Sequence, residues 1–394
     1  MSSNVKKTSI RPSLSLRSPI SSALKDTAVL DTANRTNNLS LTSLGWGHFF
    51  QQQLILEEFT QLTPFRVTEV HRNRIVLQTV MEAPDGEMQL QEQNLSTLFW
   101  KDRPTQERPT VGDWLLLDAD QQPIRLLNRF SLIQRLAAGI ETNQQLIAAN
   151  IDTLLIVTSC NQDFNLSRIE RYLSLAAESR IQPVVVLTKS DLCESPERYI
   201  DQIRSLDNLL PVESVNATDP NSVKQLQPWC KSGQTLVLTG SSGVGKSTLV
   251  NSLSGQHEQD TQDIRENDAK GRHTTTGRSL HLISGGGLLL DTPGMRELKL
   301  FDSEFGIRKT FSEIETLAEQ CRFADCLHLD EPDCAVTTAI NDGRLEARRL
   351  ESYHKLMSEQ ERSQQSVAAK REKDRALGRF YKSAKSSIKQ HKGR

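Results

Sequence analysis

The chain has 394 residues, of which 36% are hydrophobic and 5% aromatic, and its formal net charge is −1 at pH 7. This length exceeds one ordinary core, so we expect two or three domains in a soluble protein. No apolar run reaches the roughly 18 residues of a membrane span, and no apolar segment follows the basic N-terminus as in a secretory signal. The composition therefore argues against membrane and secreted proteins.

Both ends of the chain are basic. Residues 1–40 carry six Lys or Arg against two Asp, and residues 361–394 carry eleven against three acidic residues. We expect a disordered tail at 1–40, because its polar composition shows no sustained periodicity, and a second basic tail at 361–394. Such tails are typical of contact with a polyanion such as RNA. From charge alone, an ordinary solvated tail is as well supported as a tail that binds a polyanion.

Short β-like runs dominate residues 41–135. Phe65–Thr68 alternates with a period of two, Ile75–Leu77 and Val111–Leu117 follow, and turn residues such as Asp85-Gly86 separate the runs. Short strands divided by turn signals predict a small antiparallel barrel.

From Ile151 the sequence pattern changes to unbroken apolar runs. They lie within a domain that we place at residues 136–310. Four unbroken apolar runs are typical of parallel strands buried on both faces: Leu154–Val157, Val184–Leu187, Leu236–Leu238 and Leu288–Leu290. A helical pattern between the first two has an apolar side with Leu166, Ile169, Leu173 and Ala176, and Arg168, Glu170 and Arg171 elsewhere. Alternating strands and helices predict a doubly wound α/β fold, whose ligands bind beyond the carboxyl ends of the strands.

A candidate phosphate-binding loop follows the third of these strands. Nine consecutive residues fit the pattern G-x-x-x-x-G-K-[ST]: Gly240, Ser241, Ser242, Gly243, Val244, Gly245, Lys246, Ser247 and Thr248. The glycines let backbone N–H groups surround the phosphates, Lys246 can reach the β- and γ-phosphates, and the Ser247 hydroxyl can bind Mg²⁺. A chance glycine-rich turn is the rival interpretation, which the strand before and the helix-like Leu249–Leu253 after the loop disfavour.

An acidic residue ends the fourth strand, 45 residues after Lys246. The segment reads Asp291-Thr292-Pro293-Gly294. Asp291 can support the Mg²⁺ indirectly, and the Gly294 amide can approach the γ-phosphate because no Cβ intervenes. A Pro-Gly turn after a strand is common by itself, but its place after the phosphate loop favours the nucleotide interpretation.

A candidate base-reading segment, Thr188-Lys189-Ser190-Asp191, follows the second strand. Asp191 can accept two hydrogen bonds from guanine that adenine cannot offer, and the Lys189 stem can cover the base. Thr188 stands where many G proteins have Asn, so its share of the base contact is open. Val215-Asn216-Ala217 is a weak match to the loop that backs the base.

The order of these segments is unusual. The base-reading segment precedes the phosphate loop by about 50 residues, whereas in ordinary small GTPases it comes last. A circular permutation preserves the site if the strand ends stay adjacent, because catalysis depends on position in space. The sequence therefore predicts a circularly permuted GTP-binding domain.

A polar loop from Gly271 to Gly277 lies between the phosphate loop and Asp291. We choose Thr275 as its Mg²⁺ ligand, with Thr274 as the alternative, since such a threonine orders the loop only when GTP is bound. Met295 stands where Ras-like enzymes have a water-orienting Gln, so His273 is the candidate for that role. A surface loop with a solvated histidine is the rival interpretation. The candidate catalytic residues are His273, Lys246, Thr275 and Gly294.

Three cysteines and one histidine fall within 14 positions: Cys321, Cys326, His328 and Cys334. Three thiolates and one imidazole form a closed tetrahedral set for a structural Zn²⁺ in a C-terminal domain at 311–360. The rival interpretation is three reduced core cysteines. Cys160, Cys193 and Cys230 lie singly, and we interpret them as packing residues.

Together, the reversed order, the G-R-H-T-T-T loop, Asp-Thr-Pro-Gly-Met and the C-x4-C-x-H-x5-C cluster resemble the RsgA (YjeQ) family of ribosome-small-subunit-dependent GTPases. Leu44-Gly45-Trp46, Val111-Gly112-Asp113 and Asp163–Leu166 are similar to that family as well. The resemblance covers residues 41–355. It implies an OB-fold barrel, a circularly permuted GTPase domain and an α-helical zinc-binding domain.

The same resemblance implies a function. It predicts ribosome-stimulated GTP hydrolysis during late maturation of the 30S subunit, with contacts to 16S rRNA and His273 as the catalytic residue. We expect a cytoplasmic monomer with one structural Zn²⁺ and with Mg²⁺ bound beside GTP. Two other classes stay open: an ATP-dependent enzyme, if T-K-x-D is accidental, and an RNA-binding adaptor that holds nucleotide without turnover.

Overall fold

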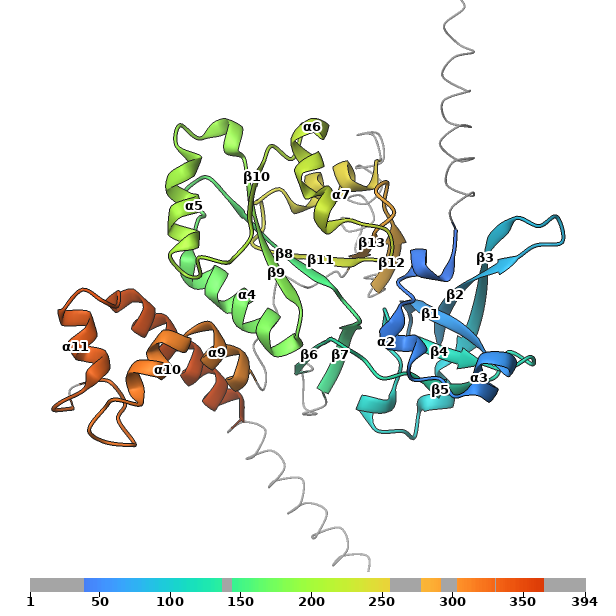
Figure 1. Cartoon of the computed structure of the whole chain (residues 1–394), viewed down its shortest axis with the longest axis horizontal. Coiled ribbons are helices and arrows are strands. Elements are labelled where there is room, and N and C mark those ends of the chain that lie inside the picture. The colour runs from blue at the N-terminus through green and yellow to red at the C-terminus, as the bar shows by residue number, and fades with distance from the viewer. Residues whose placement is uncertain (1–38, 137–143, 256–277, 292–302, 330, 365–394) are drawn as a thin grey trace, which may run out of the picture. The chain divides into compact units, whose positions relative to one another are not determined.

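The computed structural model describes residues 39–136, 144–255, 278–291, 303–329 and 331–364 (Figure 1). Strands β2 (Arg74–Glu82) and β3 (Met88–Ser96) form a hairpin whose outer residues, 80–90, belong with residues 39 and 40 to one compact unit. The rest of the described chain from residue 41 belongs to a second unit. None of the described helices is both long and apolar enough to cross a membrane.

Five parallel strands form the α/β part of the second unit. Their order in the sheet is β10-β9-β8-β11-β13, and every neighbouring pair is parallel. They are β8 (Thr153–Ser159), β9 (Gln182–Thr188), β10 (Val212–Val215), β11 (Thr235–Thr239) and β13 (Leu288–Asp291). The four apolar runs lie in β8, β9, β11 and β13 and are buried. The predicted parallel strands are therefore present, and their carboxyl ends share one edge.

Helices connect these strands: α4 (Leu166–Ser179), α5 (Pro196–Arg204), α6 (Pro220–Val223) and α7 (Lys246–Ser254), with short 3-10 turns η4 (Ser190–Leu192) and η5 (Lys224–Trp229). Asn165 begins α4, where its side chain accepts a hydrogen bond from the Arg168 amide at 3.0 Å. This contact satisfies an N–H that has no partner inside the helix. Side chains from the sheet and α7 share one core, which includes Leu155, Val157, Val186, Leu236 and Leu249.

Antiparallel strands extend the same sheet beyond β13, and most of them come from the N-terminal part of the chain. β12 (Arg278–Leu282) pairs with β13 on one side and with β1 (Thr63–Val70) on the other. β1 also pairs with β2 and, through its first residues, with β4 (Trp114–Leu117), which pairs with β5 (Pro123–Leu126). A second core lies among these strands, with Phe65, Ile75, Leu77, Trp100 and Leu115 buried. The antiparallel strands expected at 41–135 are therefore present.

Shorter elements accompany these strands. They are η1 (Leu41–Leu44), α2 (His48–Gln51), α3 (Leu56–Gln61), η2 (Thr97–Trp100), η3 (Thr105–Glu107), β6 (Leu132–Leu136) and β7 (Gln144–Ala149). β6 and β7 form a separate two-stranded sheet.

The C-terminal part is helical, with α9 (Glu304–Thr310), α10 (Ser312–Ala318), α11 (Ala335–Asn341) and a helix over 347–364. α9 packs closely on α4 (Figure 1). At Gly306 a Cβ would lie 2.1 Å from the Ser174 carbonyl oxygen, and the Gly306 amide donates to the Glu178 carboxylate at 2.8 Å. Only glycine permits so close an approach of the two helices.

The predicted pattern of α4 is wrong at Glu170. The sequence placed it among polar residues away from the apolar side, yet its side chain is fully buried. Its Oε1 accepts hydrogen bonds from Arg348 Nη1 and Arg349 Nη1, both at 2.8 Å. Arg349 also donates to Glu313 at 2.7 Å and lies 4.4 Å from the ring centroid of Phe311. Two guanidinium groups thus compensate a carboxylate in the protein interior.

Candidate functional site

The predicted phosphate loop connects β11 to α7. Gly240 has a φ of +140°, and a Cβ at this position would lie 2.1 Å from the Val157 carbonyl oxygen, so the loop requires glycine here. Lys246 begins α7, and its Nζ donates to the Gly240 carbonyl at 2.7 Å and also to the Ser241 carbonyl. The ammonium group therefore lies over the loop, where such loops bind phosphate.

The predicted base-reading segment lies directly against this loop. β9 ends at Thr188, whose Oγ1 is 2.6 Å from the Val244 carbonyl oxygen and 3.0 Å from that of Thr158. The Lys189 ammonium donates to the Gly243 carbonyl at 2.8 Å. Two segments about 50 residues apart in the chain are thus in contact, as a single permuted nucleotide site requires.

Thr188 and Asp191 differ sharply in exposure. The Thr188 side chain is fully buried and faces backbone carbonyls, and its single hydroxyl proton serves one carbonyl at a time. Asp191 in η4 is exposed, and Ser190 is half-buried. Thr188 therefore holds the phosphate loop against β9, while Asp191 is accessible to a ligand. Sequence reasoning missed this role of Thr188, because its partner Val244 is remote in the chain.

Two further strand ends meet the site at the same edge. Val215, the last residue of β10, pairs with Thr188, and the Ala217 carbonyl accepts a hydrogen bond from Ser252 of α7 at 2.7 Å. β13 runs parallel to β11 and ends at the exposed Asp291. The first turn of α7 exposes Ser247 and Thr248. These residues offer hydroxyl and carboxylate oxygens, which are the ligands that Mg²⁺ prefers.

Four predicted site residues lie outside the described residues: His273, Thr274, Thr275 and Gly294. The described chain stops at Gly255, resumes at Arg278 in β12 and stops again after Asp291. Both gaps therefore adjoin the β12–β13 pair.

The predicted metal ligands converge in space. The ligand atoms of Cys321, Cys326, His328 and Cys334 all lie within 4.8 Å of one another. Cys321 Sγ is 3.9 Å from Cys334 Sγ and 3.7 Å from His328 Nδ1, which lies 3.6 Å from Cys334 Sγ. Zinc–sulfur bonds of about 2.3 Å in a tetrahedron place ligand atoms about 3.8 Å apart. The donor set and its spacing therefore fit a zinc ion.

Local structure holds these ligands in place. Cys334 begins α11, and its Sγ accepts a hydrogen bond from the Thr337 amide at 3.4 Å. Burial disfavours the Cys334 thiolate, but the contacts with Thr337 and His328 outweigh burial and lower the pKa of Cys334 to about 6. An ion pair of 2.9 Å between Arg322 and Asp333 joins the two ends of the ligand loop. Burial instead raises the pKa of Cys326 to about 12, so the two thiols shift in opposite directions and a bound metal would displace the Cys326 proton.

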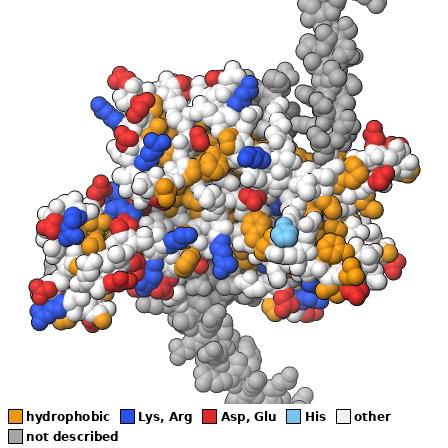
Figure 2. Space-filling model, viewed as in Figure 1, with side chains coloured by type: hydrophobic (Ala, Val, Ile, Leu, Met, Phe, Trp, Pro, Cys, Tyr) orange, Lys and Arg blue, Asp and Glu red, His pale blue; other side chains and the backbone are white. Residues whose placement is uncertain are grey.

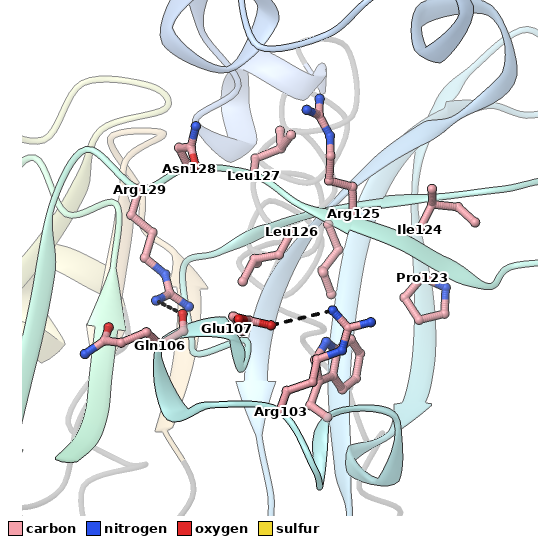
Figure 3. A pocket seen from close by; sticks show the side chains of 12 residues that line it. Arg103, Gln106, Glu107, Pro123, Ile124, Arg125, Leu126, Leu127, Asn128 and Arg129 are labelled. Atoms are coloured by element: carbon pink, nitrogen blue, oxygen red, sulfur yellow. Dashed lines mark hydrogen bonds and ion pairs between the residues drawn. The ribbon is translucent and has the colours of Figure 1, made fainter.

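A separate cavity of about 350 Å³ lies among β4, β5 and the segment 100–107 (Figure 3). Its arginines already have acidic partners. Arg129 pairs with the buried Asp113 at 2.7 Å, and Arg103 faces Glu107 at 3.9 Å. This cavity contains none of the predicted site residues.

Known proteins with similar sequences show the family to which this chain belongs. The family model described as RsgA GTPase matches residues 126–301. A relative from Vibrio vulnificus, named small ribosomal subunit biogenesis GTPase RsgA 2, is 51% identical over 347 residues, which cover 88% of this chain and 95% of the relative. The chain belongs to the RsgA GTPase family. A Mesorhizobium japonicum member, named small ribosomal subunit biogenesis GTPase RsgA, is 45% identical and covers 81% of this chain and 90% of its own length.

Two crystal structures share the fold of this RsgA-family chain. YloQ, described as a circularly permuted GTPase, aligns with a TM-score of 0.53 at 27% identity and covers 76% of this chain and 94% of its own. YjeQ from Thermotoga maritima also aligns with a TM-score of 0.53, at 23% identity, over 76% and 98%. The family resemblance and the circularly permuted, mixed α/β fold predicted from the sequence are thus confirmed.

Some residues that suggested the family serve its scaffold. Asp113 is buried and accepts hydrogen bonds from Arg129 and from the Thr110 amide, each at 2.7 Å. Burial raises the pKa of Asp113, and the Arg129 contacts oppose this rise.

Two of the single cysteines are buried, and burial raises the pKa of Cys160 and of Cys230 to about 12. These thiols therefore stay protonated and unreactive.

Proposed function

We propose that this chain binds the small ribosomal subunit and hydrolyses GTP to GDP and phosphate during late 30S maturation, with the ribosome stimulating hydrolysis. RsgA-family membership and the names of its relatives support the biological role. The observation that carries the chemistry is the contact of Thr188 and Lys189 with the phosphate loop. It brings the segment that carries Asp191 and the loop that carries Lys246 to one edge of the sheet, which supports proposed roles in base and phosphate binding.

Each residue has a proposed role in this site. Asp191 reads guanine, Lys189 and Ser190 flank the base, and Thr188 positions the loop. Residues 240–248 surround the phosphates, with Lys246 as their cation. Ser247 and Thr275 bind the Mg²⁺ that accompanies GTP, Asp291 supports it, and the Gly294 amide contacts the γ-phosphate. His273 positions the attacking water. Bound Mg²⁺ would neutralise charge on the β- and γ-phosphates.

The domain boundaries are also a proposal. Residues 41–135 form an OB-type barrel, 136–310 the GTPase domain and 311–360 a domain with one structural zinc, between basic tails at 1–40 and 361–394. The barrel exposes Leu98 and Phe99 beside Lys101 and Arg103. Apolar and aromatic side chains among cations suit single-stranded RNA, so we assign 16S rRNA contacts to this surface.

We propose that the protein is a cytoplasmic monomer.

Phosphate release tests the proposed function. Release from GTP should rise when purified small subunits are added and should collapse in Lys246→Ala, which removes the cation over the loop. No rise with subunits, together with unchanged release in Lys246→Ala, would refute the function. Faster release from ATP than from GTP would favour an ATP-dependent enzyme. Tight nucleotide binding without release, even with subunits present, would favour an adaptor.

A further inference from the structure

The loop between Cys321 and Cys334 exposes three large apolar side chains. The exposed fractions are 40% for Phe323, 65% for Leu327 and 58% for Leu329. Single exposed apolar residues are ordinary. Three within seven positions of one short loop form a cluster of the kind that marks an interaction surface. We call these three residues the ligand-loop patch.

The loop holds the patch in a fixed conformation. The Glu331 carboxylate accepts hydrogen bonds from the amides of Leu327 and Leu329, both at 2.8 Å. Between them, His328 is buried with a φ of +60° and its Nδ1 lies in the metal set. The two leucines therefore point outward because the histidine points inward. A surface ordered before binding loses little entropy when a partner docks.

The charge around the patch selects the class of partner. Four acidic residues and one arginine lie between Cys321 and Cys334. Asp325 and Asp333 are exposed and Glu331 is half-buried, and Asp333 pairs with Arg322. Figure 2 shows hydrophobic, acidic and basic side chains interspersed over the C-terminal part of the chain. Carboxylates repel nucleic-acid phosphates, which bind through Lys and Arg. They attract a basic protein surface.

We propose that the ligand-loop patch docks into an apolar cleft, bordered by Lys and Arg side chains, on a protein of the small ribosomal subunit. The inference rests on the proposed function and adds to it a protein contact separate from the rRNA contacts of the barrel. Leu327 and Leu329 fill the cleft, and Asp325 pairs with its basic border, whereas Asp333 is paired with Arg322 and Glu331 with the loop amides.

Photo-crosslinking identifies the occupant directly. Leu329→p-benzoylphenylalanine, irradiated on intact small subunits, should yield an adduct with one ribosomal protein. Leu209→p-benzoylphenylalanine is the matched control, because Leu209 is 85% exposed but lies outside the ligand loop; it should not yield that adduct. An adduct with rRNA, or with a second copy of this chain, would overturn the inference. Failure of the unsubstituted protein to bind subunits would refute the proposed function as well.

Substitutions test the energetics with an independent readout. Leu327→Asn combined with Leu329→Asn should weaken subunit binding about tenfold, with zinc content unchanged. Asp325→Lys separates the two classes of partner without touching the leucines. It should weaken binding several-fold if the partner is a basic protein, and strengthened binding would indicate rRNA and overturn the inference. Unchanged binding in both variants would overturn it too.

Discussion

At the scale of single residues, the site depends on contacts between side chains and the backbone of remote segments. Thr188 is the clearest case, because its hydroxyl lies 2.6 Å from the Val244 carbonyl oxygen of the phosphate loop. Thr239, at the end of β11, provides a contrast. It is also buried, but its hydroxyl has no hydrogen-bond partner among the described residues.

Thr188→Val should therefore destabilise the protein and weaken nucleotide binding. The substitution leaves a buried carbonyl without its donor, which costs about 1–3 kcal/mol, and it releases the phosphate loop from β9. Chemical denaturation and titration with fluorescent GDP measure the two effects. Thr239→Val is the control and should change stability by less than about 0.5 kcal/mol. Equal effects of the two substitutions would refute the positioning role of Thr188.

His273→Ala should lower the rate of GTP hydrolysis while leaving GDP affinity unchanged. The proposed histidine orients water in the transition state, and loss of such a general base or water-orienting group costs about 10²–10⁴ in rate. Single-turnover hydrolysis and GDP titration, both with small subunits present, separate the two quantities. A normal rate would remove His273 from the mechanism.

The place of the candidate phosphate loop could be predicted from the sequence, because its glycines and lysine follow an apolar run, and the loop lies between β11 and α7 as expected. The role of Thr188 could not. The sequence left the share of Thr188 in the base contact open, and the side chain faces the Val244 carbonyl 56 residues away. A contact of that range depends on the strand order of the sheet, which a single sequence does not reveal.

At the scale of elements, the C-terminal helices are joined to α4 by charged groups. Glu170 on α4 accepts hydrogen bonds from Arg348 and Arg349, and Arg349 also binds Glu313 in the first turn of α10. Arg171 and Glu359 form a further ion pair between α4 and the helix over 347–364. The sequence did not predict this junction, because a glutamate in an amphipathic helix normally faces solvent.

Arg349→Met should lower the free energy of unfolding by about 3–5 kcal/mol, because it removes one partner of a buried carboxylate. Arg344→Met provides the matched control. Arg344 pairs at 3.1 Å with Asp342, and both side chains are more than half exposed, so its loss should cost about 0–1 kcal/mol. Urea denaturation measures both changes. A loss of less than about 1 kcal/mol in Arg349→Met would show that the junction contributes little.

The Cys321–Cys334 cluster should hold about one zinc per chain, because its four ligand atoms lie within 4.8 Å of one another and form the donor set of a structural zinc site. Elemental analysis of purified protein measures the stoichiometry. Cys334→Ser should lose the metal and the helical signal of the surrounding segment. The buried Cys230 lies outside the cluster, so Cys230→Ser should keep the metal. Equal zinc content in both variants would contradict the assignment.

At the scale of the whole molecule, one continuous sheet connects the N-terminal strands with the nucleotide-binding strands. Residues 278 and 279 of β12 pair with the end of β1, and β12 pairs with β13, which carries Asp291. The sequence predicted both halves from their apolar patterns but not this junction, because antiparallel pairing across about 200 residues has no local signal. The reversed motif order did predict the circular permutation, because the motifs belong to one nucleotide site and must therefore meet in space.

We propose that Asp191 and Lys246, reversed along the chain, hold the two ends of one guanosine nucleotide. Competitive titration with GDP and ADP measures whether they do. The native protein should prefer GDP by at least about 100-fold, because only guanine satisfies the carboxylate. Asp191→Asn should abolish that preference, and Lys246→Ala should weaken GDP binding about 10–100-fold. Equal affinity of the native protein for GDP and ADP would contradict the account.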